Sequence, residues 1–250
     1  MRVLRLSTQL HKWLALIVGL QVLFWVGGGL VMTAIPIETV RGEHRVRATT
    51  PSPLPPELLA TLGAPAAPPG LSWSRVELRS TPRGPAWTLT PLRGEPRITS
   101  AVTGRPFADM SQAEARTLAA AAYAGDSSIS AVERLAEAPP ETGRDGPIWR
   151  VDFADREGTT FYLAPETGEV VTRRSGVWRF YDVFWRLHVM DWTHGENFNH
   201  PLIVVTTVLT LIFVISGLVL LWIRLSRDLN MARAARRSRA ARTGSPSDPA

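Results

Sequence analysis

The pattern of apolar and polar positions divides the chain into two long apolar runs with a polar region between them. Trp13–Ile35 and Pro201–Ile223 are each 23 residues long and contain no charged side chain. As a helix, each run would span about 35 Å, which exceeds the roughly 30 Å of a bilayer core. A buried helix of a soluble protein is seldom apolar on every face over such a length. The sequence therefore predicts two transmembrane helices.

A cleaved signal peptide is the alternative for the first run. Its apolar part is much longer than the roughly 7–15 residues of a typical signal peptide. The small-residue site nearby, Thr33-Ala34, is followed directly by Ile35 and Pro36. We therefore expect residues 13–35 to remain as the first span, after a cytoplasmic N-terminus at residues 1–12.

The region between the runs begins as a linker and then alternates between apolar and polar positions. Residues 48–70 contain seven prolines, so residues 36–70 predict a proline-rich linker with one short helical turn at Pro56–Leu62. Alternation with a period of two, together with turn signals, predicts strands at Leu71–Arg79, Ala86–Thr90, Arg97–Val102, Ser128–Leu135, Ile148–Ala154, Thr159–Leu163 and Glu169–Arg173.

One helix is predicted inside this strand-rich region. Ser111 and Glu114 have the spacing of a capping box, in which the hydroxyl accepts from the N3 amide and the carboxylate reaches back to the cap. This box would open an alanine-rich helix at Ala113–Ala124, and Gly125 would close it.

The strands and the helix together predict an α+β fold for residues 71–175. The stretch SAVTGRPF (100–107) parallels LAPETGEV (163–170), and each ends a predicted hairpin with Thr-Gly before a helix. We expect a helix packed on a curled antiparallel sheet, and the parallel stretches suggest that this unit is duplicated.

An amphipathic helix is predicted just before the second apolar run. Within residues 176–195, Val177, Tyr181, Phe184 and His188 recur at helical spacing on one face. Such a helix would lie along the outer membrane surface before the chain turns into the second span.

The placement of charge favours a membrane orientation over nucleic-acid binding. The chain has 28 basic residues, with Lys12 its only lysine, and a net charge of +6. Basic residues flank the outer ends of both apolar runs, so both termini are predicted to be cytoplasmic and the domain to face the other side. A nucleic-acid-binding protein would concentrate this charge on its folded domain. Within the basic cytoplasmic tail at residues 224–250, MARAARRSRAAR (231–242) predicts a disordered segment that meets anionic lipid, with a cytoplasmic protein contact as the alternative.

Residue types exclude several kinds of site. The chain has no cysteine, which excludes disulfides, zinc–thiolate sites, iron–sulfur clusters and c-type haem attachment. It also lacks the nucleophile-elbow, zinc-protease and nucleotide-loop motifs. Asp152 and Glu166 are interpreted as a sheet-edge acid and a turn acid rather than as a catalytic pair. The sequence therefore favours a binding or accessory module over a self-sufficient enzyme.

Histidines form the main cluster of candidate ligands. RLHVMDWTHGENFNHP (186–201) contains His188, His194 and His200, three of the five histidines in the chain. Asp191 follows His188 by three residues and could orient its ring, as carboxylates do for metal-bound histidines. No structural zinc motif has this spacing. The alternative is a set of histidines that lie at the membrane interface without a ligand.

Depth in the membrane limits how the histidines could pair on a cofactor. A haem needs two axial ligands at one depth, and His44 follows the first span on the same side as the cluster. Within one chain, His44 with His188, His194 or His200 is therefore the allowed pair. His11 would lie about 30 Å away, across the bilayer, and would need a partner from another subunit.

Five stretches resemble a known family. WRVDFAD (149–155) and TTFYLAPETGEVVTRR (159–174) resemble the PepSY domain. HKWLALIVGLQVLFWVGGGLVM (11–32) resembles the first helix of PepSY-associated transmembrane proteins. WRFYDVFWRLHVMDW (178–192) with FNHPL (198–202) resembles the segment that leads into their second helix. The resemblance covers nearly the whole chain apart from the proline-rich linker and the basic tail.

The resemblance implies a bacterial inner-membrane protein whose domain lies in the periplasm. Secreted PepSY domains are proposed to inhibit or chaperone peptidases, and larger PepSY-associated membrane proteins include ferric-siderophore reductases that hold b-type haem through histidines. We expect a module that binds an extended peptide or a partner protein, with assembly into a homo-oligomer as a further expectation. The alternatives are an electron-transfer subunit that holds haem b at the histidines and serves iron reduction with an inner-membrane redox partner, and a membrane-tethered peptidase inhibitor.

Overall fold

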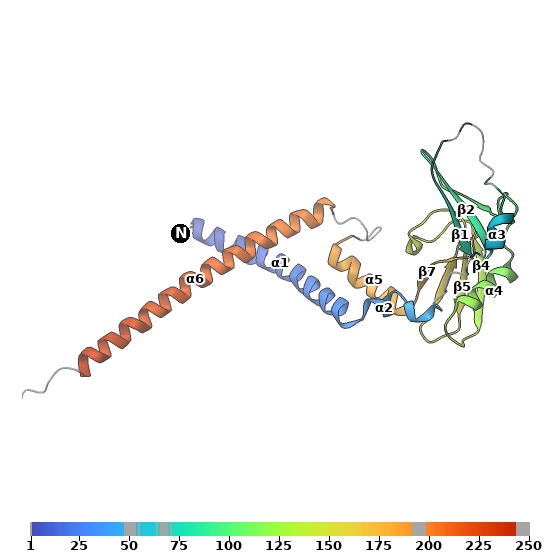
Figure 1. The fold of residues 1–250 in the computed structure, drawn as a ribbon. Coiled ribbons are helices and arrows are strands. Elements are labelled where there is room, and N and C mark those ends of the chain that lie inside the picture. Colours follow the sequence, from blue (N-terminus) through green and yellow to red (C-terminus); the bar gives the residue numbers. More distant parts are fainter. Residues whose placement is uncertain are drawn as a thin grey trace, which may run out of the picture. The chain divides into compact units, whose positions relative to one another are not determined.

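The computed structural model describes residues 2–47, 54, 56–63, 65, 70, 72–191 and 199–243. The chain separates into two compact units. Leu30–Trp185 form an α+β unit with two antiparallel sheets, and residues 1–29 and 186–250 form a helical unit. The α+β class predicted from the sequence is confirmed for the first of these units (Figure 1).

Three strands form the first sheet, in the order β1-β2-β3. A two-residue turn joins β1 (Trp73–Thr81) to β2 (Gly84–Pro91), and β3 (Arg97–Ser100) pairs with the other side of β2. Gly84 has a φ of +109°, which side chains with a Cβ rarely adopt, so this tight turn needs a glycine. The three strands agree with the alternating stretches of the sequence.

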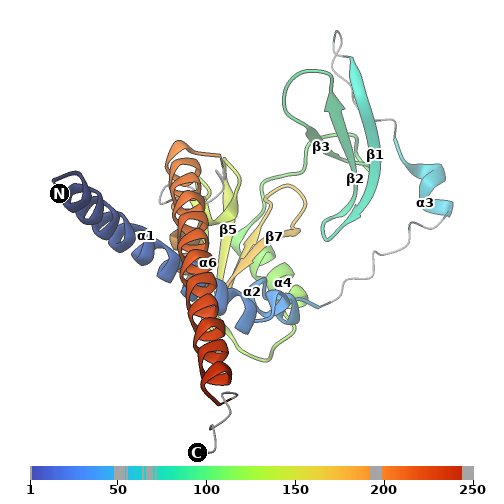
Figure 2. The same ribbon diagram turned by 90° about the vertical axis from the view of Figure 1, so that its left-hand side faces the viewer.

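Four strands form the second sheet, a meander in the order β4-β5-β6-β7. They are β4 (Ile129–Leu135), β5 (Ile148–Phe153), β6 (Thr160–Leu163) and β7 (Val170–Arg174), each antiparallel to its neighbour. Asp152 lies on β5 in the interior of this sheet, so the prediction that it is a sheet-edge acid is wrong. Figure 2 shows the three-stranded sheet as a layer separate from β5 and β7.

Helix α4 (Gln112–Ala122) follows the first sheet in the chain but packs against the second sheet. Its residues Ala115 and Ala119 are fully buried. The core beneath the helix consists of Met110, Ala115, Ala119, Tyr123, Val132, Trp149, Val151, Phe153, Phe161 and Leu163. Because the helix presents small alanines, it approaches the sheet closely, and aromatic side chains from the strands fill the space between them.

The N-terminal cap of α4 is confirmed, but the second half of the predicted capping box is not formed. The Ser111 hydroxyl accepts a hydrogen bond from the Glu114 amide at 3.2 Å. The Glu114 carboxylate instead binds the Arg83 guanidinium at 2.8 Å. The helix also ends before Gly125, where an added Cβ would lie 2.6 Å from the Tyr123 ring. Gly125 is therefore needed for close packing rather than as a left-handed cap.

Arg83, in the turn between β1 and β2, joins the first sheet to the second sheet and its helix. Its side chain is only 8% exposed and pairs with Glu114 of α4. Its guanidinium also donates to the carbonyl oxygens of Pro165 and Glu166, at 3.0 and 3.1 Å, and lies 5.2 Å from the centroid of the Phe107 ring. These partners fix how the two sheets meet, since a buried charge without partners costs several kcal/mol.

Residues 36–47 pack onto the α+β unit, in contrast to the linker predicted for them. Val40, the last residue of α2 (Ile37–Val40), is buried. Val46 forms an isolated antiparallel bridge with Tyr123, at the end of α4, and packs against the core. The burial of these two valines turns the first part of the predicted linker into part of the folded unit.

Short helical turns complete the α+β unit. They are η1 (Glu43–Arg45), α3 (Pro56–Thr61) and η2 (Pro140–Thr142). The helical turn predicted within the proline-rich stretch is confirmed as α3.

Two long helices make up most of the helical unit. α1 (Arg2–Ala34) contains Ala15–Ala34, the one stretch in the described part of the chain that is long and apolar enough to cross a membrane. α6 (Pro201–Thr243) begins with a shorter apolar stretch, Pro201–Ile215. The described apolar surface of this unit lies on α1 and on α6, where it extends as far as Met231.

Two helices end elsewhere than the sequence predicts. α6 continues to Thr243, through the whole of the segment predicted as disordered at residues 231–242. The apolar run already forms a helix, so extending it requires no new nucleation. Alanine and arginine both favour the extension. The helix predicted at residues 176–195 is α5 (Gly176–Val189), which ends early because Met190 adopts the left-handed conformation, with a φ of 56°.

Candidate functional site

Side-chain alternation gives the four-stranded sheet an apolar face and a polar face. On β5, Trp149 and Val151 belong to the core beneath α4. Arg150 and Asp152 therefore lie on the opposite face, because successive side chains of a strand point to opposite sides. The neighbouring strand β6 repeats this pattern and adds Tyr162 to the polar face.

Tyr162 is the centre of a hydrogen-bonded network on the polar face. It is 1% exposed, and its hydroxyl donates to the Glu141 carboxylate at 2.7 Å. Glu141, in η2, also accepts from Arg179 of α5 at 3.2 Å. Arg174 of β7 donates to the Glu141 carbonyl at 2.7 Å and lies 4.0 Å from the centroid of the Trp178 ring. The network therefore holds the sheet, η2 and α5 together.

A second polar group lies beside this network. Arg150 Nε donates to the Asp152 carboxylate at 3.1 Å, and the Thr160 hydroxyl donates to the same carboxylate at 2.7 Å. The side chains of Arg150 and Arg179 are 39% and 41% exposed. Each guanidinium has five N–H donors, so both arginines keep donors for a ligand.

The two polar groups line an open pocket of about 420 Å³. Its walls are formed by Pro139, Glu141, Arg150, Asp152, Phe153, Gly158, Thr159, Thr160, Tyr162 and Arg179. The positive charges of the two guanidinium groups balance the negative charges of the two carboxylates, and hydroxyl groups lie between them. The pocket can therefore offer both donors and acceptors to a ligand.

The surroundings shift the pKa of three groups in and beside the pocket. Burial, with the hydrogen bond to Glu141, raises the pKa of the Tyr162 phenol well above its ordinary value. Burial lowers the pKa of Arg174, against the attraction of Glu141. Burial also acts against the charge of Arg150, but the hydrogen bond to Asp152 helps to raise the pKa of Arg150 overall. Tyr162 and Arg150 therefore hold their protons at neutral pH, as suits recognition rather than proton transfer.

A separate ion-pair cluster holds the segment after α1 to the turn between β5 and β6. Arg45 binds the Glu157 carboxylate through two nitrogens, at 2.6 and 3.1 Å, and His44 Nε2 lies 3.2 Å from the same carboxylate. The hydrogen bond from Arg45, supported by that from His44, lowers the pKa of Glu157. The Gly176 amide, at the start of α5, donates to the Glu157 carbonyl at 2.7 Å. Glu157 thus contacts both of the segments through which the unit is connected to the long helices.

Three of the four candidate histidines lie in the described part of the chain. His44 lies in the α+β unit, in the ion-pair cluster, whereas His188 and His200 belong to the helical unit. His194 lies outside the described residues. His200 Nε2 lies 3.0 Å from the Val189 carbonyl, so this nitrogen is the donor.

His188 has a buried ring nitrogen that lacks a hydrogen bond. Its Nδ1 has no partner among the described residues. The His188 carbonyl accepts from the Trp25 indole nitrogen at 2.8 Å, and the two ring centroids are 6.5 Å apart. Asp191 is buried just beyond the end of α5, and it does not bind Nδ1 of His188.

Two of the described histidines have hydrogen-bond partners within the chain. The Nε2 atoms of His44 and His200 bind a carboxylate and a carbonyl. The described residues also contain no group of three or more metal-binding side chains. Of the histidines whose side chains are described, His188 is the one with an unpaired buried nitrogen.

A folded α+β unit follows a long apolar helix and precedes a second helix with an apolar start. This arrangement is typical of a membrane-associated protein. The family model described as PepSY-associated TM region matches residues 8–244. The match covers nearly the whole chain, so the chain belongs to this family, and the resemblance seen in the sequence is confirmed. No curated protein and no solved structure matches the chain.

Sequence analysis missed the pocket, although part of its signal was present. In WRVDF, Arg150 and Asp152 alternate with core residues, so a polar site on the far face of the sheet could have been inferred. Glu141 and Arg179 carry no such signal, because they lie in a helical turn and in a different helix. Only the folded chain brings these two residues to Tyr162.

Proposed function

We propose that this protein is anchored by two membrane spans, α1 and α6, and displays its α+β unit in the periplasm. Residues 201–223 of α6 contain no charged side chain, which is enough for a second span of about 35 Å. Arg and Lys residues precede the apolar part of α1 and follow that of α6, which supports cytoplasmic termini.

Reporter fusions test this orientation. Alkaline phosphatase, which matures only outside the cytoplasm, should be active when fused after residue 120 and inactive when fused after residue 250. The reverse pattern would contradict the proposed topology and the outer placement of the α+β unit.

The function that the geometry supports best is recognition of an extended peptide segment by the pocket of the four-stranded sheet. The observation that carries this proposal is the pocket itself, with arginines and carboxylates around the buried Tyr162 on the face that α4 leaves open. A peptide backbone presents both donors and acceptors, so a charge-balanced polar wall suits it better than it suits a simple anion. The protein would act as an accessory module, by holding a substrate peptide or a segment of a partner protein near the membrane.

Peptide binding by the full chain in nanodiscs tests the proposed function. Fluorescent decapeptides of alanine that carry Glu or Arg at alternate positions should bind saturably. Arg150→Gln should weaken binding about tenfold, because a hydrogen bond to a charged group contributes about 1.5–3 kcal/mol. Arg134→Gln is the matched control, since Arg134 lies on β4 outside the pocket and is 47% exposed. An equal loss in both variants, or no binding of any peptide, would contradict the pocket as the site.

The second candidate function is electron transfer through haem b, and the observation that favours it is the unpaired buried nitrogen of His188 beside Trp25. The second axial ligand would come from His44, His194 or His200, or from another chain. An absorption spectrum of protein purified from haem-replete cells tests this candidate. A Soret band that disappears in His188→Ala would support it, and a colourless protein would contradict it.

A further inference from the structure

Eight of the exposed apolar residues of α6 follow a seven-residue repeat, and other exposed apolar residues, such as Val205, Leu209 and Ile212, lie on its remaining faces. The members of the repeat alternate at spacings of three and four residues, and each is about half or more exposed in the helical unit. They are Val204, Val208, Leu211, Ile215, Leu218, Trp222, Leu225 and Leu229. Residues with this spacing form one narrow seam along a helix, the geometry by which two parallel helices pack.

The last part of this seam continues beyond the proposed span. Leu225 and Leu229 come after the charge-free run, which ends at Ile223. Each directly follows a charged residue, Arg224 and Asp228 respectively. Leu229 lies about 9 Å past the end of that run, beyond the hydrocarbon that covers the earlier seam residues. Both leucines are about half exposed.

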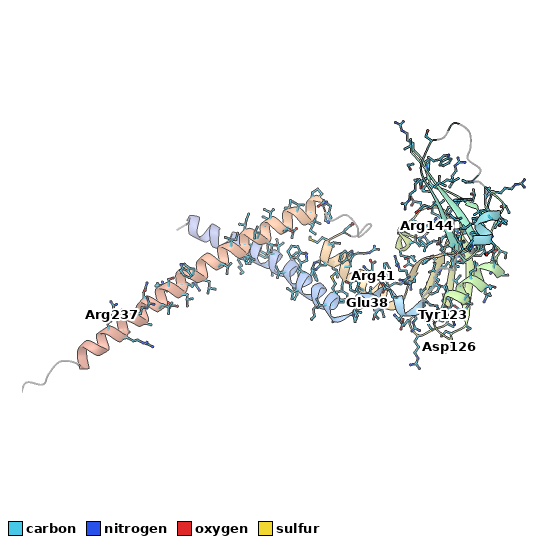
Figure 3. The ribbon with its side chains drawn as sticks, in the orientation of Figure 1. Glu38, Arg41, Tyr123, Asp126, Arg144 and Arg237 are labelled. Atoms are coloured by element: carbon cyan, nitrogen blue, oxygen red, sulfur yellow. The ribbon has the colours of Figure 1, made fainter. Side chains whose placement is uncertain are left out.

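No other helix of the described unit covers this part of α6. Figures 1 and 2 both show the C-terminal part of α6 running clear of α1. In Figure 3, Arg237 lies on this projecting part of the helix. A partner that covered Leu225 and Leu229 would gain roughly 1.5–3 kcal/mol for each side chain that it buried fully.

The charges beside the seam indicate what that partner is. Asp228 is the only acidic residue of α6, and it forms no ion pair within the described part of the chain. In a parallel pair with Leu225 and Leu229 on the seam, Asp228 occupies the position that faces Arg233 of the other helix. A two-fold axis makes this ion pair twice. A second copy of this chain therefore fits both the apolar seam and its charges.

The extent of the contact is also limited by charge. Arg236 occupies the seam position that follows Ala232. Two copies of this arginine would face each other and repel, so the paired region ends at Ala232.

We propose that this protein is a parallel homodimer joined along the α6 seam, with Leu225 and Leu229 packed against their counterparts outside the bilayer. The proposal rests on α6 being the second span. It goes beyond peptide recognition by the pocket, because the dimer would bring two α+β units to one place on the membrane.

Disulfide cross-linking tests the dimer directly, because the chain contains no cysteine. Leu225→Cys and Leu229→Cys place a single thiol on the seam, and Arg227→Cys and Asn230→Cys place one off it. After mild oxidation of isolated membranes, the cross-linked fraction of the seam variants should exceed that of the off-seam variants about fivefold or more. Equal cross-linking at all four positions, or a maximum off the seam, would overturn the proposal.

Charge exchange provides an independent readout. Asp228→Arg and Arg233→Asp should each lower the cross-linked fraction of Leu225→Cys about twofold, as expected for an exposed ion pair. The double exchange should restore it. No change in either single variant would overturn the proposed register.

Labelling of the same cysteines separates failure of the dimer from failure of the span. A membrane-impermeant maleimide should reach Leu225→Cys from the cytoplasmic side of inverted vesicles. Correct labelling without seam-specific cross-linking would overturn the dimer and leave the two-span topology intact. Labelling from the periplasmic side would overturn both.

Discussion

The two sheets of the α+β unit consist of the same kind of alternating strand but are covered differently. In the four-stranded sheet, the rings of Tyr123, Phe153 and Phe161 pack beneath α4, with centroids 4.0 to 5.9 Å apart. In the three-stranded sheet, Leu89 is buried but Val76 on β1 is 48% exposed. Both sheets therefore arise from strands with alternating apolar and polar residues. The core of the four-stranded sheet is closed because α4 covers it.

The helix also protects one edge of the sheet that it covers. Gln112 of α4 donates to the Val132 carbonyl of β4 at 2.8 Å, and β4 is the first strand of the four-stranded order. β1 is an edge strand of the other sheet. An uncovered edge can pair with another chain, whereas a capped edge favours recognition on the face of the sheet. This difference is one reason to place ligand binding at the pocket.

The largest expected effect is the loss of an aromatic side chain from the covered core. Phe161→Ala should lower the free energy of unfolding by about 3–5 kcal/mol, because Phe161 is fully buried and leaves a cavity. Hydrogen exchange of the full chain in detergent should show faster exchange in β4–β7 than in β1–β3. Equal acceleration in both sheets would show that they unfold as a single unit.

The next effect concerns the contact between the sheets. Arg83→Met keeps much of the side-chain volume but removes the bonds to Glu114 and to two carbonyl groups, so we expect a loss of about 2–3 kcal/mol. Exchange should rise first at the turn between β1 and β2 and at the turn after β6. Unchanged exchange at the second turn would mean that Arg83 does not hold the sheets together.

A smaller effect is expected at the pocket. Tyr162→Phe removes the bond to Glu141 at 2.7 Å, while Arg179 still binds that carboxylate. The stability should fall by about 1 kcal/mol, the usual net contribution of such a hydrogen bond. Urea unfolding followed by tryptophan fluorescence measures this change. A loss as large as that of Phe161→Ala would contradict the assignment of one ordinary hydrogen bond to the Tyr162 hydroxyl.

Acid should weaken the ion-pair cluster around Glu157. Because the folded state lowers the pKa of Glu157, its contribution to stability is complete above its unfolded pKa of about 4.3 and is lost as the pH falls through the lower folded value. The loss should reach at most about 1 kcal/mol, as for a half-exposed pair. Unfolding between pH 6 and pH 2 measures it, and Glu157→Gln should remove this part of the pH dependence. An unchanged acid profile in that variant would assign the effect to other carboxylates.

The smallest effect is expected on the exposed face of the three-stranded sheet. Val76→Thr keeps a β-branched side chain at a position that is 48% exposed, so the stability should change by less than about 0.5 kcal/mol. A larger loss in the same urea experiment would show that a partner or another part of the chain covers this face.

The local structure of the chain could be predicted from its sequence. Strand alternation, the Ser111 cap and the apolar run within α1 depend on residues only a few positions apart, so neighbouring residues carry enough information to specify them. Two helix ends were missed for local reasons as well, because Met190 adopts an unusual conformation and α6 propagates into its basic tail.

The tertiary structure alone decided which distant groups meet. Arg45 binds Glu157 across 112 residues of sequence, and Tyr162 binds Glu141 across 21. Such pairs depend on how the strands and helices pack together. The sequence around a polar residue in a loop does not indicate which distant residue it will bind. The sequence by itself therefore determined the apolar runs, the strands and the family of this protein. Packing decided the pocket, the docking of residues 36–47 and the hydrogen-bond partners of His44 and His200, because burial and charge pairing act only between groups that folding brings together.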